Sequence, residues 1–205
     1  MNTYEELSRT VQIDHNNRLL KYDESSLIHV GTGRSAFVFK IKSTMKAMKV
    51  FFPACSHIAK EEAGIYGELQ DIVYYPSVYA SGVNFIVIDF IEGLTLFDCI
   101  VQGKVIERTH IAEIDHALSL ATARGLNPSD IHLRNILITI DNDVKIIDVA
   151  RFRQKKDCQQ WDNLKRAYRQ FYCKRFFPKE IPAVFLNTIA WLYKKDWIPL
   201  YRART

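Results

Sequence analysis

The sequence predicts an α+β fold in which a small antiparallel sheet with one helix precedes a mainly helical part. Two observations predict it. Short runs with alternating or β-branched residues fill much of the first 90 positions, and helical spacing of apolar residues prevails after them. The chain has 205 residues, 48% of them hydrophobic, which suits one large domain or two small lobes around a packed core.

The first part contains five segments with strand patterns. The expected strands are Leu27–Val30, Phe37–Ile41, Lys46–Phe51, Ser77–Ala80 and Phe85–Phe90. Pro53 ends the third strand, because proline cannot donate to a strand ladder. A Ser-Gly turn at positions 81–82 joins the last two strands into a hairpin.

One helix is expected among these strands, at Ser56–Leu69, with its first serine as the N-cap. Ile58, Ile65 and Leu69 recur at helical spacing on one face, and Glu62 shares that face. A carboxylate on a buried face is costly unless it is paired. Glu62 therefore needs a cationic partner.

The second part begins near Gly93. Its expected elements are a helix at Ile111–Ala123, a loop at Gly125–Asn135, strands at Ile136–Ile140 and Val144–Ile147, and helical, aromatic sequence from Gln159 to Tyr201. The helix buries the stripe Ile111, Ile114, Leu118 and Ala121. Near the end of the chain, the expected core residues are Trp191, Leu192 and Trp197.

The net charge of +5 is unevenly distributed. Residues 1–150 carry 14 Lys and Arg against 19 Asp and Glu, whereas residues 151–205 carry 14 against 4. This basic end indicates either an acidic partner, such as nucleic acid or a ribosome, or a solvated cationic face. The same choice applies to the aromatic residues Tyr168, Phe171, Tyr172, Phe176 and Phe177, which interleave with Lys165, Arg166, Arg169, Lys174 and Arg175. Base stacking is one interpretation, and a helix core with a charged outer face is favoured.

The expected location is cytoplasmic. The polar, acidic N-terminus does not resemble a signal peptide, and no apolar stretch reaches the roughly 18 residues of a membrane span. The four cysteines form no metal-binding pattern, so reduced thiols in a reducing cytosol are expected.

A glycine-rich turn and a strand lysine are the first candidates for phosphate binding. The turn, Gly31-Thr32-Gly33-Arg34-Ser35-Ala36-Phe37-Val38, lies between two expected strands, so it is either a simple hairpin turn or a backbone cradle for phosphates. Lys49 on the next strand either faces solvent or points its ammonium at those phosphates. In the second case Glu62 is its natural partner, with Glu68 as the fallback.

The sequence from Asp130 to Asn135, followed by Asp148, is the strongest chemical signal. Asn135 precedes one strand and Asp148 ends its partner, so the fold should bring their side chains together. Amide and carboxylate oxygens suit Mg²⁺, and Asp130 would orient or deprotonate an attacking hydroxyl. Each aspartate alone could be a turn or cap residue, but the joint spacing favours a site.

These residues together resemble the motifs of the protein-kinase superfamily, over about residues 27–150. The matching segments are the glycine loop Gly31 to Val38, the lysine strand Ala47 to Lys49, the helix residue Glu62, the hinge Ile88 to Gly93, the catalytic loop Asp130 to Asn135, and Asp148 in the position of the D-F-G aspartate. The resemblance implies a bilobal fold: an N-terminal extension at 1–24, an antiparallel β N-lobe with one helix at 25–92, and a truncated, mainly α C-lobe at 93–205.

The resemblance also implies ATP and Mg²⁺ as cofactors. The implied catalytic residues are Asp130, Lys49 and Glu62; the nucleotide contacts are Gly31, Gly33, Val38, Ala47, Lys49, Asp89 and Ile91; and the metal ligands are Asn135 and Asp148.

Several positions depart from the kinase pattern. The third loop glycine is Ala36, the catalytic-loop lysine is His132, and Val149 replaces the D-F-G phenylalanine, which argues against a Phe switch. Pro128 and Ser129 replace the His and Arg before the catalytic aspartate, no A-P-E motif is found, and only about 55 residues follow Asp148. In this shortness the chain resembles RIO-type kinases and minimal bacterial serine/threonine kinases.

Three functional hypotheses follow. The first is a serine/threonine protein kinase, with autophosphorylation. The altered surroundings of Asp130 and Asp148 motivate the second, a nucleotide-binding pseudokinase or scaffold. The third is a kinase of a small-molecule hydroxyl substrate, suggested by His132 and the missing peptide groove.

Overall fold

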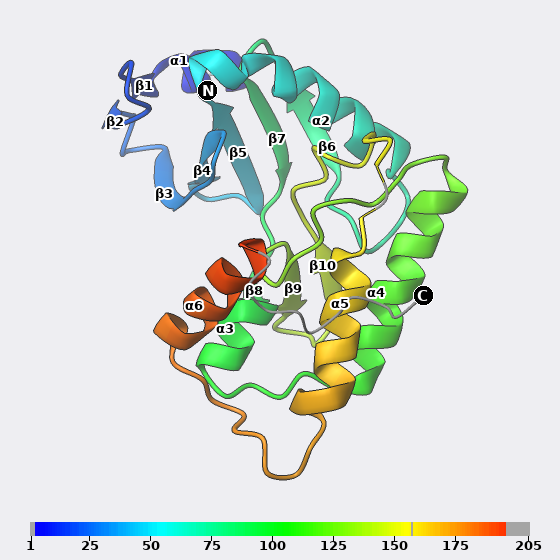
Figure 1. Cartoon of the computed structure of the whole chain (residues 1–205). Coiled ribbons are helices and arrows are strands. Elements are labelled where there is room, and N and C mark those ends of the chain that lie inside the picture. Colours follow the sequence, from blue (N-terminus) through cyan, green and yellow to red (C-terminus); the bar gives the residue numbers. More distant parts are fainter. Residues whose placement is uncertain (1–2, 157, 196–205) are drawn as a thin grey trace.

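The computed structural model describes residues 3–156 and 158–195 (Figure 1). In chain order the elements are α1 (Tyr4–Arg9), β1 (Gln12–Ile13), β2 (Leu19–Lys21), β3 (Leu27–Thr32), β4 (Ala36–Ile41), β5 (Lys46–Phe51), the 3-10 turn Pro53–Cys55, α2 (Ser56–Glu68), β6 (Val78–Ser81), β7 (Phe85–Asp89), β8 (Gly93–Thr95), α3 (Leu96–Val101), α4 (Arg108–Ala123), β9 (Ile136–Thr139), β10 (Val144–Ile146), α5 (Gln160–Ala167), the π-helix Tyr168–Tyr172 and α6 (Ala183–Lys194).

The larger sheet confirms the predicted mixed α+β class with antiparallel strands. Its strand order is β3-β4-β5-β7-β6, and every neighbouring pair is antiparallel. β4 and β5 pair without a register shift, with Val38 opposite Lys49. The predicted strands agree with the observed ones to within two residues at each end. In Figure 1 this sheet and α2 form the upper part of the molecule, above α3, α5 and α6.

Both faces of the larger sheet are covered, which explains why β5 is buried along nearly its whole length. On one face the N-terminal segment adds Leu7 and Val11 to a cluster that contains Phe39 and Met48. On the other face α2 begins a second cluster that continues to α3, α4 and the smaller sheet. A continuous apolar core thus connects the upper and lower parts of the molecule.

Helix α2 buries the predicted face. Ile65 and Leu69 are almost fully buried, Glu62 is 0% exposed, and Ile58 packs partly against the same core. The predicted N-cap is wrong: Cys55 caps the helix without a side-chain hydrogen bond, and Ser56 is already helical. A 3-10 turn that begins at Pro53 precedes the helix, because proline fits the first position of a helical turn.

The smaller sheet has the strand order β10-β9-β8. β8 approaches β9 so closely that a Cβ atom at Gly93 would lie 2.4 Å from the Ile138 carbonyl oxygen, so glycine is required there. Helix α4 packs beside this sheet and buries the predicted stripe Ile111, Ile114, Leu118 and Ala121. It ends at Gly125, whose φ of +81° closes the helix in the left-handed conformation.

The C-terminal part is less continuous than predicted. Helix α5 and the π-helix end at Tyr172, and an irregular segment with Pro178 and Pro182 precedes α6. Trp191 was expected in the core but is 51% exposed, so that prediction is wrong. Leu192 is half-buried, and Trp197 and residues 196–201 of the predicted helical sequence lie outside the described residues.

The aromatic residues of this part divide into two groups. Tyr172 is buried, and Tyr168 and Phe177 pack partly against the core, as the favoured interpretation predicts. Phe171 and Phe176 are instead exposed, Phe176 at 95%. The core interpretation therefore holds for three of the five aromatic residues.

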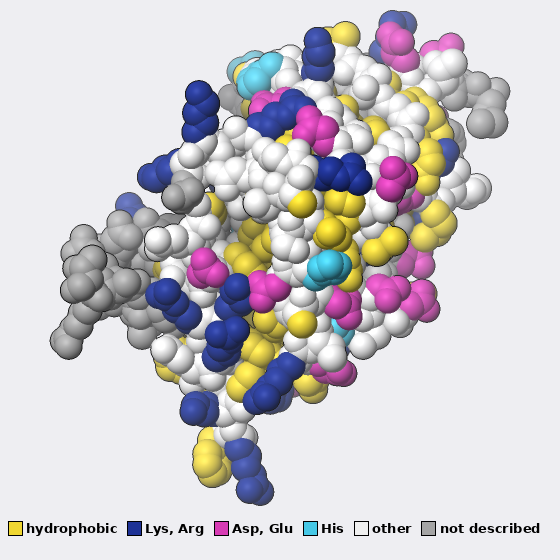
Figure 2. All heavy atoms as spheres, turned by 90° about the vertical axis from the view of Figure 1, so that its right-hand side faces the viewer, with side chains coloured by type: hydrophobic (Ala, Val, Ile, Leu, Met, Phe, Trp, Pro, Cys, Tyr) yellow, Lys and Arg dark blue, Asp and Glu magenta, His cyan; other side chains and the backbone are white. Residues whose placement is uncertain are grey.

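Positive charge gathers on the lower part of the face shown in Figure 2, the side of the molecule that carries α4 and α5. Some of the cations are used internally: Lys165 pairs with Asp115 and Asp162, Arg153 with Glu68, and Lys179 donates to the Tyr172 carbonyl. Among the described residues, no helix combines the length and the apolar character needed to cross a bilayer.

The N-terminal helix should contribute measurably to stability. Leu7→Ala removes a side chain that is 5% exposed and leaves a cavity, so the free energy of unfolding should fall by about 2–4 kcal/mol. Leu20→Ala is the matched control, because Leu20 is 65% exposed and should change stability by less than about 0.5 kcal/mol. Urea denaturation measures both, and equal losses would contradict the assigned packing of α1.

Candidate active site

Lys49 is the centre of the candidate site. It lies on β5 between β4 and β7, where strand residues on both sides leave it only 9% exposed. Its Nζ donates to both carboxylate oxygens of Glu62, at 2.9 and 2.7 Å, and to Oδ1 of Asp148, at 2.9 Å. Carboxylates from a neighbouring helix and from a segment 99 residues away thus converge on one ammonium group.

The surrounding charges set the ionisation of this cluster. Burial alone would lower the pKa of Lys49, but the carboxylates of Glu62 and Asp148 raise it above its ordinary value. Burial raises the pKa of Glu62, and Lys49 offsets only part of that effect. For Asp148, burial is outweighed by Lys49, His132 and Arg34, so its pKa is lowered. Asp148 is therefore held as a carboxylate, the form that binds a cation.

The loop from Asp130 to Asn135, the catalytic-type loop, is held in shape by its own polar groups. Asp130 has a φ of +61°, in the left-handed region, and its carbonyl oxygen accepts a hydrogen bond of 3.1 Å from Nδ2 of Asn135. That bond uses the amide nitrogen of Asn135 and not its amide oxygen. The Asn135 carbonyl in turn accepts from the Ile147 N–H at 2.8 Å, so Asn135 lies next to the residue that precedes Asp148.

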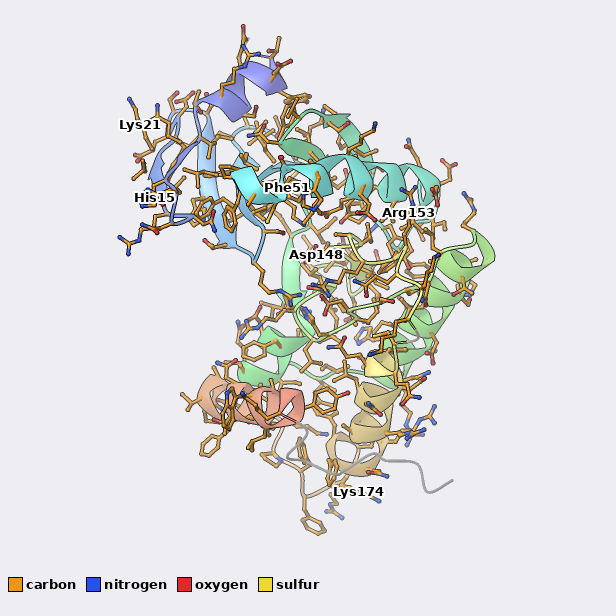
Figure 3. All side chains as sticks on the ribbon, turned by 45° about the horizontal axis from the view of Figure 1, so that its top comes forward. His15, Lys21, Phe51, Asp148, Arg153 and Lys174 are labelled. Carbon is orange, nitrogen blue, oxygen red and sulfur yellow. The ribbon has the colours of Figure 1, made fainter. Side chains whose placement is uncertain are left out.

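An amide oxygen and a carboxylate on adjacent backbone segments fit a hard cation such as Mg²⁺. Asn135 is 5% exposed, whereas the Asp148 side chain keeps 43% of its surface accessible. Asn135 is therefore held within the fold, and Asp148 remains accessible to a cation from solvent. In Figure 3, Asp148 lies at the junction between the upper sheet and the lower helices. The backbone segments that carry the two predicted metal ligands are thus adjacent.

Asp130 has cationic partners that sequence reasoning did not identify. Arg34, from the glycine-rich turn, donates to its Oδ2 at 2.6 Å, and Nε of Arg151 lies 3.5 Å from the same oxygen. The Arg34 side chain is 67% exposed, so it can leave the aspartate without disturbing the core. The sequence feature that could have indicated this contact is the position of Arg34, a charged residue within the glycine-rich turn.

The glycine-rich turn has an open backbone. The Gly33 N–H donates to the Ala36 carbonyl at 2.8 Å, which closes the turn. A Cβ atom at Gly31 would meet no atom within 4 Å, and neither Gly31 nor Gly33 has a positive φ. Contacts and conformation within the chain therefore do not require glycine here. Close approach of a phosphate group to a bare backbone would be a reason for glycine at these positions.

The predicted adenine contacts lie on the three central strands of the larger sheet, β4, β5 and β7, and just after β7. Val38 and Ala47 are on β4 and β5, and Ala47 pairs with Ile88 at the end of β7. The Asp89 N–H donates to the Ser77 carbonyl, so that group is occupied, and the Asp89 carboxylate accepts from the Ser77 N–H and the Tyr79 hydroxyl. This leaves Ile91, which follows β7, as the better placed hinge residue.

Two further residues complete the description. Glu68, the fallback partner for Lys49, pairs instead with Arg153 in the segment after Asp148.

Tyr66 was not identified from the sequence, although it lies one helical turn after Glu62. Its hydroxyl oxygen accepts a hydrogen bond of 3.0 Å from the Asp148 N–H. Burial, Glu62 and Asp148 raise the pKa of Tyr66 well above its ordinary value, so the phenol stays neutral.

A strand lysine paired with a helix glutamate, facing an aspartate, an asparagine and a second aspartate, is the arrangement of a protein-kinase-type phosphotransferase. Comparison with known proteins supports the same class. The chain is 46% identical over 204 residues to the "Putative serine/threonine-protein kinase YrzF" of Bacillus subtilis (strain 168), a match that covers 98% of this chain and 95% of that protein. The chain belongs to the protein-kinase superfamily. No protein-family model matches it.

Removing the lysine should cost more than removing an exposed one. Lys49→Met leaves the fully buried Glu62 without its counter-charge, so the free energy of unfolding should fall by about 3 kcal/mol. In the double variant Lys49→Met/Glu62→Leu most of that loss should be recovered, because no fully buried unpaired charge remains; the Asp148 side chain is 43% exposed. Urea denaturation is the measurement.

The matched control is Lys40→Met on the adjacent strand. Its ion pair with Glu92 is 25% and 45% exposed on the two sides, so the change should be less than about 1 kcal/mol. If the single and double variants at Lys49 lose the same stability, the uncompensated charge is not the cause.

Proposed function

We propose that this chain is a Mg²⁺- and ATP-dependent serine/threonine protein kinase that transfers the γ-phosphoryl group of ATP to a hydroxyl, including hydroxyls of its own chain. The observation that carries the proposal is the convergence of Lys49, Glu62 and Asp148 within hydrogen-bonding distance. The relative from Bacillus subtilis, similar over nearly its whole length, supports it by its name.

Each side chain has a role that matches its surroundings. Lys49, held by Glu62, would contact the α- and β-phosphates, and the backbone at Gly31 and Gly33 would cover them. Val38, Ala47, Asp89 and Ile91 would line the adenine position. Asn135 and Asp148 would hold Mg²⁺, which supplies positive charge to the phosphate oxygens.

The phosphoryl acceptor would meet Asp130. Its carboxylate would accept the proton of the attacking hydroxyl, which gives up that proton as its oxygen bonds to the γ-phosphorus and ADP departs. For this step Oδ2 of Asp130 must leave its contacts with Arg34 and Arg151. The two arginines are more than half exposed, so the exchange needs no repacking of the core.

The larger sheet with α2 would form the N-lobe, residues 25–92, and the helical part with the smaller sheet a truncated C-lobe, residues 93–205, with residues 1–24 as an extension. The cationic surface of residues 151–205 would meet an acidic partner, nucleic acid or ribosome among them, through those cations that lack internal partners. We place the protein in the cytoplasm, because all four of its cysteines are free thiols, as in a reducing compartment.

One observation favours a second candidate, a kinase-fold nucleotide-binding module with little turnover. Arg34 and Arg151 both engage Asp130, so the catalytic aspartate is neutralised by two cations. Replacement of the catalytic-loop lysine by His132 would also suit a kinase of small-molecule hydroxyls. A large thermal shift with Mg²⁺ and ATP, but no phosphate transfer to protein or metabolite substrates, would select the binding module.

The direct test is transfer of label from [γ-³²P]ATP by the full chain, in Mg²⁺, to itself and to a generic protein. Asp130→Asn should reduce the initial rate by about 10²–10⁴-fold, because the hydroxyl loses its proton acceptor, and Asp148→Ala should abolish transfer. Asp141→Asn, an exposed aspartate in the β9–β10 turn, is the matched control and should keep the wild-type rate. Label that is equal in the wild type and in Asp130→Asn would refute the proposal.

A further inference from the structure

Tyr66 links helix α2 to the segment that carries Asp148. It lies four residues after Glu62, and thus on the same helix face, one turn further along. Its side chain is 0% exposed, and its hydroxyl oxygen accepts the hydrogen bond from the Asp148 backbone N–H at 3.0 Å. One face of α2 therefore contacts both ends of the ion-pair cluster: Glu62 holds the Lys49 ammonium, and Tyr66 holds the backbone of Asp148.

The backbone at Asp148 needs support. Its φ is +62°, a left-handed conformation that non-glycine residues adopt only when the surrounding structure holds them there. Two successive peptide groups are fixed at this point. The Ile147 N–H donates to the Asn135 carbonyl at 2.8 Å, and the Asp148 N–H donates to Tyr66. The resulting geometry places Oδ1 of Asp148 2.9 Å from Nζ of Lys49.

The side chains directly after Asp148 offer less support than the D-F-G pattern would. Val149 is fully buried but small, and Ala150 follows it, so the first large buried ring of this segment is Phe152, four residues after Asp148. The Asp148 backbone N–H is held from the opposite helix, by its hydrogen bond to the Tyr66 hydroxyl.

We propose that Tyr66 is a positioning residue that sets the orientation of Asp148 toward the metal ion by holding its backbone N–H. This inference rests on the proposed function, because it concerns the same Mg²⁺-binding aspartate. Groups that orient a metal ligand typically change metal affinity by about 10–100-fold when they are removed. The expected effect is therefore on Mg²⁺ affinity, with the rest of the fold intact.

The test variant is Tyr66→Phe, which removes one oxygen atom. Tyr75→Phe is the matched control, because Tyr75 is 4% exposed and its hydroxyl donates to the Ala117 carbonyl at 3.0 Å, away from the site. Both variants lose one buried hydrogen bond. Thermal unfolding is followed at fixed ATP while MgCl₂ is titrated, with ATP plus EDTA as the metal-free reference.

The Mg²⁺ concentration for half-maximal thermal shift should rise about tenfold or more in Tyr66→Phe. It should stay at the wild-type value in Tyr75→Phe, and the shift with ATP plus EDTA should be the same in all three proteins. Equal Mg²⁺ midpoints in the two variants would overturn the role of Tyr66 alone. If the wild type itself shows no Mg²⁺-dependent shift with ATP, the proposed function fails, and this inference fails with it.

A second measurement covers the case in which Tyr66→Phe does not fold. In the wild-type protein, the backbone amide of Asp148 should exchange with solvent deuterium far more slowly than an amide without a hydrogen-bond partner. Exchange of that amide at the rate of an unprotected peptide would overturn the proposed bond to Tyr66.

Discussion

The arrangement of this protein depends on one buried cation. Lys49 lies in the interior of a sheet that is covered on both faces, where an unpaired ammonium would be strongly disfavoured. Its partners Glu62 and Asp148 come from a helix and from the end of a distant strand. Satisfying this single charge therefore fixes α2 against the sheet and brings the lower part of the molecule to the same point. The residues that we propose for phosphoryl transfer lie around this charge as a consequence.

Much of this arrangement could be predicted, because local periodicity carried the information. Helical spacing placed Glu62 on an apolar face, and a carboxylate there required a cation, for which Lys49 on the preceding strand was the natural candidate. Asn135 and Asp148 flank two strands that pair antiparallel, so their proximity followed from the hairpin. The strands were predictable because each is short, β-branched and bounded by turn residues.

The remaining features depend on contacts that local pattern does not encode. The pairing of Arg34 with Asp130 joins residues 96 positions apart and requires the glycine-rich turn to lie over the catalytic-type loop. Spacing alone could place Tyr66 on the face of Glu62, but its hydrogen-bond partner is set by the fold. Near the C-terminus, Trp191 was assigned to the core by composition. Helix α6, however, begins only after two prolines, and it leaves that ring half exposed.

The contact between Arg153 and Glu68 limits how the molecule can open. Helix α2 is tied at three successive levels, by Lys49 to Glu62, by the Asp148 backbone to Tyr66 and by Arg153 to Glu68. Rotating the helix outward would break all three contacts, so together they oppose movement of α2 away from the strand lysine. The turn at residues 31–36 contacts Asp130, in the lower part of the molecule, through the exposed Arg34. Entry and exit of a nucleotide at the proposed site would thus depend on movement of this surface turn.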